Sequence, residues 1–348
     1  MQGQDYKDRV KDFFQELLLL LDEHDTIVFI SHDNMDPDAV GSILGMVGLL
    51  EQTCSMEFSW VVFPDTISKL SKNLLEATNI DLEMVEKLPK DDFLPILLDV
   101  QNIGTLLDDD PGIVKDIQSR AVIIDHHQPE DNLDSRLKFI DNDAQSNCEL
   151  IFYLYEYNGA SLKPPCSFAL LAGILYDSGF FRFTNNRTLK ASTSILESGV
   201  EIEDVRRILR VKMDVSERIA RLKAGSRVEY VKIGSVVIAY SNVSMYEASA
   251  CRGLVSLGAD IALVLAEKDG QIRISARQTE ECLRSYDVNL GIVMQEVGEF
   301  IGGTGGGHDM AAAANGTTDG PGGLKKAIKI IEDIIITRIE NKKQSDKP

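Results

Sequence analysis

Short apolar segments in the first half of the chain end in acidic or histidine residues, and this pattern constrains the fold more than any other feature. The segments are TIVFIS (26–31), FLPILLDV (93–100) and RAVIIDHH (120–127). Continuous apolar runs of this length are typical of strands buried on both faces of a parallel sheet. Because ligands bind beyond the carboxyl ends of such strands, the polar residues there are expected to form a site at one sheet edge.

Helical segments separate these predicted strands. Residues 39–52, 145–158 and 166–176 have helical apolar spacing, and 57–63 is a further strand-like run. Strands that alternate with helices indicate an α/β fold. We therefore predict the α/β class, with an N-terminal parallel-sheet domain over residues 1–198.

The second half predicts a smaller mixed α/β domain over residues 226–340. Residues 199–225 are charged and helical, and we interpret them as a linker with connecting helices. Segment 227–242 predicts two strands joined by a turn, and 259–277 predicts a hairpin that turns at KDG. The chain closes with a predicted helix, GGLKKAIKIIEDIIITRIENKK, and a polar tail over 341–348.

Composition limits the class of protein. A length of 348 residues suggests about two domains, and 44% hydrophobic residues can supply their cores. No apolar run reaches the ~18 residues of a membrane span. The N-terminus has no secretion signal, so we expect neither membrane insertion nor export. The five cysteines are odd in number and form no CxxC pair, which favours reduced thiols in the cytoplasm.

The net charge of −19 also restricts the partners of the chain. Tight binding to long nucleic acid relies on many contacts between basic side chains and phosphates, so long duplexes are not expected. A short anionic substrate held at one local site remains compatible with this charge. The simplest interpretation of the acidity, and the one we weight most, is solubility.

The first candidate site is ISHDNMDPDAVGS (30–42), which follows a predicted strand and leads into a helix. His32, Asp36 and Asp38 are spaced as H-x-x-x-D-x-D. Imidazole and carboxylate ligands together suit Mn²⁺, Fe²⁺ or Zn²⁺ better than Ca²⁺. The alternative is an acidic loop in which Asp38 simply caps the following helix, and we weigh it equally at this stage.

Three further motifs place acidic or histidine residues at the ends of predicted elements. Asp99 ends the run ILLDV, and Asp125, His126 and His127 end AVIIDHH. Asp177 follows the apolar run LLAGILY, where a helix terminus leading into a turn is the alternative. Each acid alone is a weak signal, but two adjacent histidines after an aspartate are hard to explain by packing.

The fifth and sixth candidates lie in the second half. The segment GGTGGGHDMAAAA (302–314) is rich in glycine, which lets backbone N–H groups approach a phosphate closely. It leads through His308 into a helix-prone alanine run, so a helix N-terminus is expected to add its dipole. Arg277 ends a predicted strand and could pair with a substrate phosphate. A flexible loop and a surface salt bridge are the respective alternatives.

Together these residues predict metal-dependent phosphoester hydrolysis. Four of the five histidines fall in the motifs above, and His24 is the exception. The motifs of the first half supply enough ligands for two metal ions. A two-metal site holds both the attacking and the leaving oxygen of a phosphoryl displacement.

The motifs also resemble those of a known family. SHDNMDPDAVGS, LLDV, IIDHH and ILYDSG resemble, in order, the motifs of the DHH phosphoesterase superfamily, and GGTGGGH resembles its DHHA1 subdivision. The resemblance covers nearly the whole chain. It implies a larger DHH domain and a smaller DHHA1 domain with the active site in the cleft between them. It also implies two bound Mn²⁺ ions, for which Mg²⁺ or Co²⁺ could substitute.

The resemblance implies a ligand set for each ion. His32 and Asp36 are implied for one ion, and Asp99 for a position that bridges the two. Pro37 departs from many relatives, which have Gly or Ala between the two acids, and this implies a stiffer loop with the same ligands. The ligands implied for the other ion are Asp38, His126 and Asp177.

The resemblance assigns further roles around the metals. His127 is implied to face the scissile phosphate, and Asp125 to orient the histidine pair. With the bridging Asp99, these are the implied catalytic residues. The residues implied to hold the terminal phosphate or nucleotide of the substrate are Arg277, Gly305, Gly306, Gly307 and His308.

Several substrate classes occur among such relatives. The length and two-domain plan fit best the small oligoribonuclease and pAp-phosphatase enzymes, which act on short single-stranded oligonucleotides or nucleotides. RecJ-like single-strand exonucleases usually add nucleic-acid modules, and none is recognisable here. We also consider a stand-alone cyclic-di-AMP phosphodiesterase and a non-catalytic nucleotide-binding module. The complete ligand set argues against the non-catalytic module, and a homodimer is compatible with the family but indicated by no segment.

Overall fold

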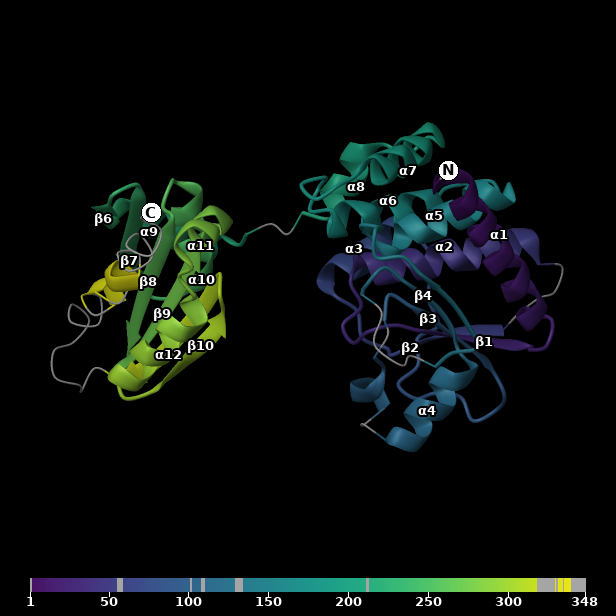
Figure 1. Cartoon of the computed structure of the whole chain (residues 1–348), viewed down its shortest axis with the longest axis horizontal. Coiled ribbons are helices and arrows are strands. Elements are labelled where there is room, and N and C mark those ends of the chain that lie inside the picture. Colours follow the sequence, from purple (N-terminus) through teal and green to yellow (C-terminus); the bar gives the residue numbers. More distant parts are fainter. Residues whose placement is uncertain are drawn as a thin grey trace, which may run out of the picture. The chain divides into compact units, whose positions relative to one another are not determined.

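The computed structural model forms two compact units, Met1–Val211 and Lys212–Pro348, each with its own sheet and core (Figure 1). No helix in the described part of the chain is both long and apolar enough to cross a membrane. The structure describes residues 2–54, 59–100, 102–107, 110–128, 134–210, 213–317, 329, 331–333 and 335–338.

The first unit is built on a five-stranded parallel sheet. Its strand order is β2-β1-β3-β4-β5, so the chain reverses its direction of winding between β2 and β3. The elements of this unit are α1 (Gln2–Leu21), β1 (Thr26–Ile30), α2 (Pro37–Thr53), β2 (Ser59–Phe63), α3 (Lys69–Thr78), β3 (Leu94–Leu98), the 3₁₀ helix η1 (Gly104–Leu107), α4 (Pro111–Arg120), β4 (Val122–Asp125), β5 (Leu137–Ile140), α5 (Asn147–Asn158), α6 (Cys166–Asp177), α7 (Asn186–Glu197) and α8 (Ile202–Ile208).

Both faces of this sheet are buried, which explains the continuous apolar strands. Ile27 and Phe29 of β1 belong to the large core shared with α1, α2, α5 and α6. Val28 and Ile30 point to the opposite face, into a smaller core with Ile117 of α4. Figure 1 shows these helices as two layers on either side of the strands. The alternation follows from the two-residue period of a strand.

The second unit contains a six-stranded mixed sheet in the order β10-β11-β9-β8-β7-β6. Only β7 and β8 pair in parallel among its described strands. One core packs α12 on the sheet, and another packs α9 and α10 on it. The elements are α9 (Val215–Ser226), β6 (Glu229–Ile233), β7 (Val236–Asn242), α10 (Glu247–Ser256), β8 (Ile261–Lys268), β9 (Gln271–Gln278), α11 (Glu280–Tyr286), α12 (Leu290–Phe300), β10 (Thr304–His308) and β11 (Ala311–Thr317).

The α/β class, the parallel first sheet and the mixed second sheet are confirmed. The predicted strands and helices of the first half correspond to β1–β4, α2, α5 and α6. The two units divide between Val211 and Lys212, inside the segment 199–225 interpreted as a linker. Its two helices therefore belong to different units: α8 contacts α6, and α9 contacts α10.

The prediction of a glycine loop followed by a helix was wrong. Residues 304–308 and 311–317 form the hairpin β10–β11, and β11 also pairs with β9. Alanine favours helices in isolation, but Ala312 and Ala314 fill the core beneath α12, and tertiary packing decides. Of the predicted closing helix, residue 329 and residues 331–333 and 335–338 are helical; the rest of it, and the tail 341–348, lie outside the described residues.

Candidate functional site

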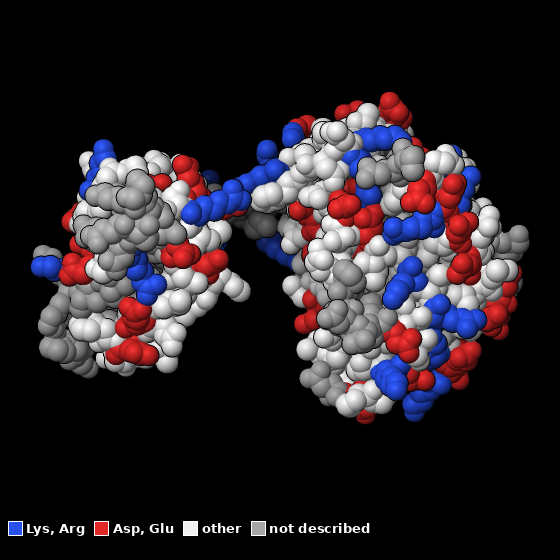
Figure 2. All heavy atoms as spheres, in the orientation of Figure 1, with Lys and Arg blue, Asp and Glu red and all other residues white. Residues whose placement is uncertain are grey.

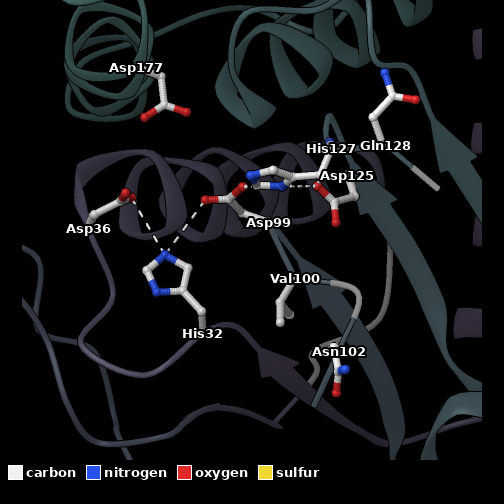
Figure 3. A pocket seen from close by; sticks show the side chains of 9 residues that line it. All are labelled: His32, Asp36, Asp99, Val100, Asn102, Asp125, His127, Gln128 and Asp177. Carbon is white, nitrogen blue, oxygen red and sulfur yellow. Dashed lines mark hydrogen bonds and ion pairs between the residues drawn. The ribbon is translucent and has the colours of Figure 1, made fainter. Parts of the chain in front are cut away.

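Polar side chains from separate segments of the first unit meet at the carboxyl edge of its sheet (Figure 3). His32 follows β1, Asp99 follows β3, Asp125 ends β4, and Asp177 ends α6. They line an open cavity of about 450 Å³. The lining residues are His32, Asp36, Asp99, Val100, Asn102, Asp125, His127, Gln128 and Asp177.

Asp99 lies at the centre of this arrangement. Its Oδ2 is 3.8 Å from His32 Nε2, and its Oδ1 is 3.3 Å from His126 Nε2. Figure 3 shows the Asp99 carboxylate between His32 on one side and the ring of His127 on the other, with His127 Nδ1 3.6 Å from Oδ1. Two oxygens of one carboxylate therefore face two different sets of side chains.

Three groups of possible metal ligands lie around this carboxylate, and the donor atoms within each group lie within 4.8 Å of one another. One group, Asp99, Asp125, His126 and His127, overlaps the other two. We call the other two the His32 group and the His126 group. The His32 group is His32, Asp36 and Asp99, and the His126 group is Asp38, His126 and Asp177.

The backbone of Asp99 is held in an uncommon conformation. Its φ of +58° is left-handed, which few residues other than glycine adopt without support. Its N–H donates to Ile124 O at 3.2 Å. The buried Asn147 amide is oriented so that both of its polar atoms have partners. In this orientation the Asn147 side-chain oxygen accepts from Asp99 N at 3.3 Å, and the side-chain nitrogen donates to Ile124 O at 3.1 Å. These contacts fix the direction in which the Asp99 carboxylate points.

Asp38 is fully buried and is held by the start of α5. Asn147 N donates to Asp38 Oδ2 at 2.6 Å, and Cys148 N donates to Oδ1 at 2.9 Å. A helix N-terminus stabilises a carboxylate through its unpaired N–H groups and its dipole. Asp38 is therefore not the cap of its own helix α2. Asp36 is that cap, accepting from Asp38 N and Ala39 N.

Asp125 and His127 form a hydrogen-bonded pair. His127 Nδ1 lies 2.8 Å from Asp125 Oδ1, and His127 N donates to the same oxygen at 3.0 Å. The pKa of Asp125 is below its usual value, because the contacts with His127 outweigh the effect of burial. An ionised carboxylate only accepts hydrogen bonds, so Nδ1 carries a proton. The raised pKa of His127, caused first by Asp125, favours the imidazolium form.

Several features of this site suit bound cations. Asp99 Oδ1 and His126 Nε2 are buried and form no hydrogen bond within the described chain, although they lie close to each other. Buried carboxylates are costly unless a positive charge compensates them. The two groups together hold four carboxylates, whose formal charge two divalent ions would balance. Imidazole and carboxylate ligands are the set that Mn²⁺, Fe²⁺ or Zn²⁺ accept.

When no cation is bound, protonation of the site residues reduces the negative charge of the buried carboxylates. Burial raises the pKa of Asp99 to about 6 and that of Asp38 well above its usual value. Burial opposes a charged His126, but the contacts with Asp177 and Asp99 raise its pKa to about 11. The contact with Asp36 raises the pKa of His32 to about 9. Both imidazoles are thus protonated at neutral pH without a metal.

The predicted residues of the second unit share one row of its sheet. Ala311 of β11 pairs with Arg277 of β9 on one side and with His308 of β10 on the other. Directly opposed residues project to the same face, so Arg277 and His308 flank Ala311 on that face. Arg277 is half-buried and His308 is exposed.

The glycines of β10 have a packing role that the sequence did not reveal. A Cβ on Gly305 would overlap Met294 O, and one on Gly298 of α12 would overlap the backbone of Thr304 and Gly305. Helix α12 therefore approaches β10 backbone to backbone. Such contact requires glycine on both elements.

Sequence reasoning missed other residues at the site of the first unit. Asn147, which contacts the backbone around Asp99, had no motif to reveal it. Val100, Asn102 and Gln128 also line the cavity, and each follows a predicted site residue by one to three positions in the chain. Their positions beside strand ends were the one available signal.

Comparison with known families agrees with this division of the chain. Residues 26–174 match the DHH family N-terminal domain, and residues 234–337 match the DHHA1 domain. The chain belongs to the DHH phosphoesterase superfamily. The match to the DHH domain contains five of the six residues of the two ligand groups, and Asp177 lies three residues after its end. Enzymes of this superfamily are metal-dependent hydrolases.

Related sequences match this chain at modest identity. An uncharacterized protein of Methanocaldococcus jannaschii is 33% identical over 331 residues, which cover 93% of this chain and 96% of that protein. The bifunctional oligoribonuclease and PAP phosphatase NrnA of Bacillus subtilis is 29% identical over 187 residues, 52% of this chain and 56% of NrnA. The cyclic-di-AMP phosphodiesterase GdpP of Geobacillus thermodenitrificans is 26% identical over 85% of this chain, but only 45% of GdpP is matched.

A solved structure supports the same fold. An exopolyphosphatase-related protein from Bacteroides fragilis superposes with a TM-score of 0.59 and 19% identity. The match covers 98% of both chains. At this identity the similarity concerns the DHH–DHHA1 fold alone.

Proposed function

We propose that this DHH protein hydrolyses phosphodiester or phosphomonoester bonds of short oligonucleotides or nucleotides with two Mn²⁺ ions. The observation that carries the proposal is the Asp99 carboxylate, whose two oxygens face His32 and His126. A carboxylate between two ligand groups is what a two-metal site requires. The named relatives NrnA and GdpP support phosphate esters of nucleotides as the substrate class.

In this proposal the six residues of the two groups hold the ions, with Asp99 contributing to both. Bound metal ions lower the pKa of water and neutralise charge on a phosphoryl group. The protein supplies the rigid arrangement: α5 fixes Asp38, and Asn147 fixes the backbone of Asp99. Ligands held in this way need little reorganisation during the reaction.

His127 interacts with the substrate in this proposal rather than with a metal. Its Nδ1 donates to Asp125, and this contact raises the pKa of the ring, which favours the positively charged form. The side chain is 60% exposed, and Figure 3 shows it on the wall of the cavity. An imidazolium there can donate a hydrogen bond to a phosphoryl oxygen as negative charge develops.

The second unit supplies substrate contacts in this proposal. Arg277 can bind a phosphate through paired N–H groups. His308 and the β10 glycines Gly305, Gly306 and Gly307 lie on the strand beyond β11, which separates them from Arg277, and are proposed as further contacts. These residues would select a short substrate with a terminal phosphate.

Surface charge favours short substrates over long strands. On the face of the first unit in Figure 2, basic side chains are interspersed with acidic ones. The formal net charge is −19. Binding along a strand of many phosphates requires a basic groove, so a RecJ-like exonuclease is the weaker alternative. A cyclic-di-AMP phosphodiesterase remains the second candidate, because the match to GdpP extends over both domains of this chain.

One substrate panel tests the proposal. The full chain is loaded with Mn²⁺ and assayed with pAp, pApA, a 5-mer RNA, a longer single-stranded DNA, pyrophosphate and cyclic-di-AMP. We expect turnover of pAp, pApA or the 5-mer, and slower turnover of the long DNA. Hydrolysis confined to pyrophosphate or to the long DNA would overturn the substrate class, and no hydrolysis by metal-loaded protein would overturn the enzyme.

A further inference from the structure

Exposed aromatic residues lie on both sides of Asp177, the last metal-ligand candidate, in the sequence. Tyr176, Phe180 and Phe183 are 37%, 43% and 55% exposed, whereas Phe181 between them packs against the core of the first unit. Large aromatic side chains gain much from burial, so three exposed ones within eight residues require an explanation. We call Phe180 and Phe183, the two beyond Asp177, the aromatic platform.

The backbone that presents this platform is strained. Phe180 and Phe181 have φ values of +59° and +68°, a region that bulky side chains rarely occupy. Hydrogen bonds hold the turn: Phe180 N donates to Leu175 O at 2.8 Å, and Phe183 N donates to Ser178 O at 2.9 Å. Strain of this kind persists where the surrounding structure enforces it, and it is concentrated at ligand sites. Folding alone does not require the outward direction of Phe180.

The platform follows shortly after Asp177, a residue of the proposed metal site, in the chain. Asp177 lines that cavity, and the bond from Phe180 to Leu175 keeps Phe180 within about one helical turn of it. Phe183 lies against the same turn, because a Cβ on Gly179 would be 3.6 Å from its ring. The chain segment that carries the aromatic rings therefore begins at the edge of the cavity in which a phosphate ester is proposed to bind.

Arg182 extends this surface with a positive charge. Its guanidinium carbon lies 5.3 Å from the centroid of the Phe183 ring. Arg182 is exposed and forms no ion pair with the residues that the structure describes, despite the strong excess of acidic side chains. Arginine stacked on an aromatic ring is a surface on which nucleic-acid bases also stack.

We propose that Phe180, Phe183 and Arg182 form a stacking subsite for a nucleobase adjoining the scissile phosphate. The subsite rests on the proposed function and refines it, because it selects nucleotides over phosphates that carry no base. Stacking on aromatic faces tolerates any base, so little preference among adenine, guanine, cytosine and uracil is expected. The start of this segment at the cavity and the stacked arginine favour a base over a protein partner as the occupant.

The test compares a dinucleotide with analogues that each lack one base. The wild-type chain with Mn²⁺ is assayed with 5′-phosphorylated diadenylate and with its two abasic analogues, one for each position. We expect kcat/KM to fall about ten-fold or more for one analogue, as base–aromatic stacking predicts. In Phe180→Leu and Phe183→Leu, the ratio of kcat/KM between the intact dinucleotide and the affected abasic analogue should fall toward one. The kcat/KM for the abasic analogue itself should stay unchanged, because it has no base to stack at that position.

Two further variants serve as controls. Phe183→Trp keeps an aromatic face and should keep the preference for the intact dinucleotide. Phe300→Leu makes the same exchange at a 47% exposed phenylalanine of the second unit and should change nothing. Thermal unfolding and metal content establish that each variant is folded and loaded.

The possible outcomes separate the two proposals. Wild type that hydrolyses none of the three substrates contradicts the proposed function itself. Wild type that hydrolyses all three with equal efficiency overturns the stacking subsite and leaves the phosphoesterase intact; this result needs no variant. A uniform loss on all three substrates in both leucine variants likewise overturns the subsite, because it reports a structural role.

Discussion

The two units of this protein use their conspicuous sequence motifs in different ways. In the first unit, acids and histidines from distant segments meet at one sheet edge, and several of them are buried there. In the second unit, the glycine-rich motif forms an edge strand whose glycines permit close packing of α12. A motif of polar residues thus points directly to chemistry, whereas a motif of glycines also reflects packing.

The largest expected effect concerns Asp99, whose two carboxylate oxygens face His32 and His126. Asp99→Asn keeps the size of the side chain and removes its charge. Because bound metals contribute several kcal/mol to catalysis, kcat should fall by about 10³-fold or more. Steady-state assays on the best substrate of the panel measure it. The matched control is Asp22→Asn, an exposed aspartate of the same unit, and activity in Asp99→Asn equal to this control would contradict the role.

The second effect is a pH dependence of metal affinity that belongs to the first unit alone. Without metal, the pKa values of His32 and His126 are about 9 and 11, so both rings are protonated near neutral pH. Metal binding must release these protons, and affinity should therefore rise with pH. The two histidine protons alone correspond to about 100-fold per pH unit between pH 6 and 8, and a proton released from Asp38 would add to this dependence. Calorimetry in buffers of different ionisation enthalpy counts the protons, and a count of zero would contradict the protonated metal-free state.

The third effect tests the packing role of a glycine in the second unit. Gly305→Ala should destabilise this unit by about 2–4 kcal/mol, because its Cβ overlaps Met294 O. Hydrogen–deuterium exchange should show faster exchange in β10, β11 and α12, and no change in the first unit. Asn315→Ala, at an exposed position of β11, is the control. Unchanged exchange in Gly305→Ala would mean that the glycine serves only the substrate.

The smallest effect concerns support around the ligands. Asn147→Ala removes the amide contacts with the backbone of Asp99 and Ile124 but leaves the N–H bond to Asp38. Loss of such supporting contacts typically weakens metal affinity by about 10- to 100-fold, and we expect the lower end. A metal titration of the variant measures it. Affinity equal to wild type would show that Asp99 needs no help from Asn147.

Much of the first unit was predictable because sheet topology converts sequence order into proximity. The strand-end positions of His32, Asp99 and Asp125 followed from apolar runs alone. The role of Asp38 was only half predictable: its partners Asn147 and Cys148 are more than a hundred residues away, and no local pattern marks them. In the second unit, alternation in 259–277 predicted the β8–β9 hairpin correctly. The alanine run led to a wrong helix prediction. Its pairing with β10 on one side and β9 on the other overrides its local helix propensity.

The exposed aromatic residues also escaped sequence reasoning. FFRF has the composition of an ordinary apolar segment, and only the structure separates the half-buried Phe181 from the exposed Phe180 and Phe183. The separation depends on two consecutive left-handed residues, which no sequence pattern announced.

The central claim is that the first unit binds two metal ions that share Asp99. Elemental analysis of the Mn²⁺-reconstituted chain, combined with electron paramagnetic resonance, tests it most directly. We predict two Mn²⁺ per chain with a spin-coupled signal in the wild type, and loss of that coupling in Asp99→Asn. A single Mn²⁺ with an isolated-ion signal, or no bound Mn²⁺ after reconstitution, would contradict the two-metal centre.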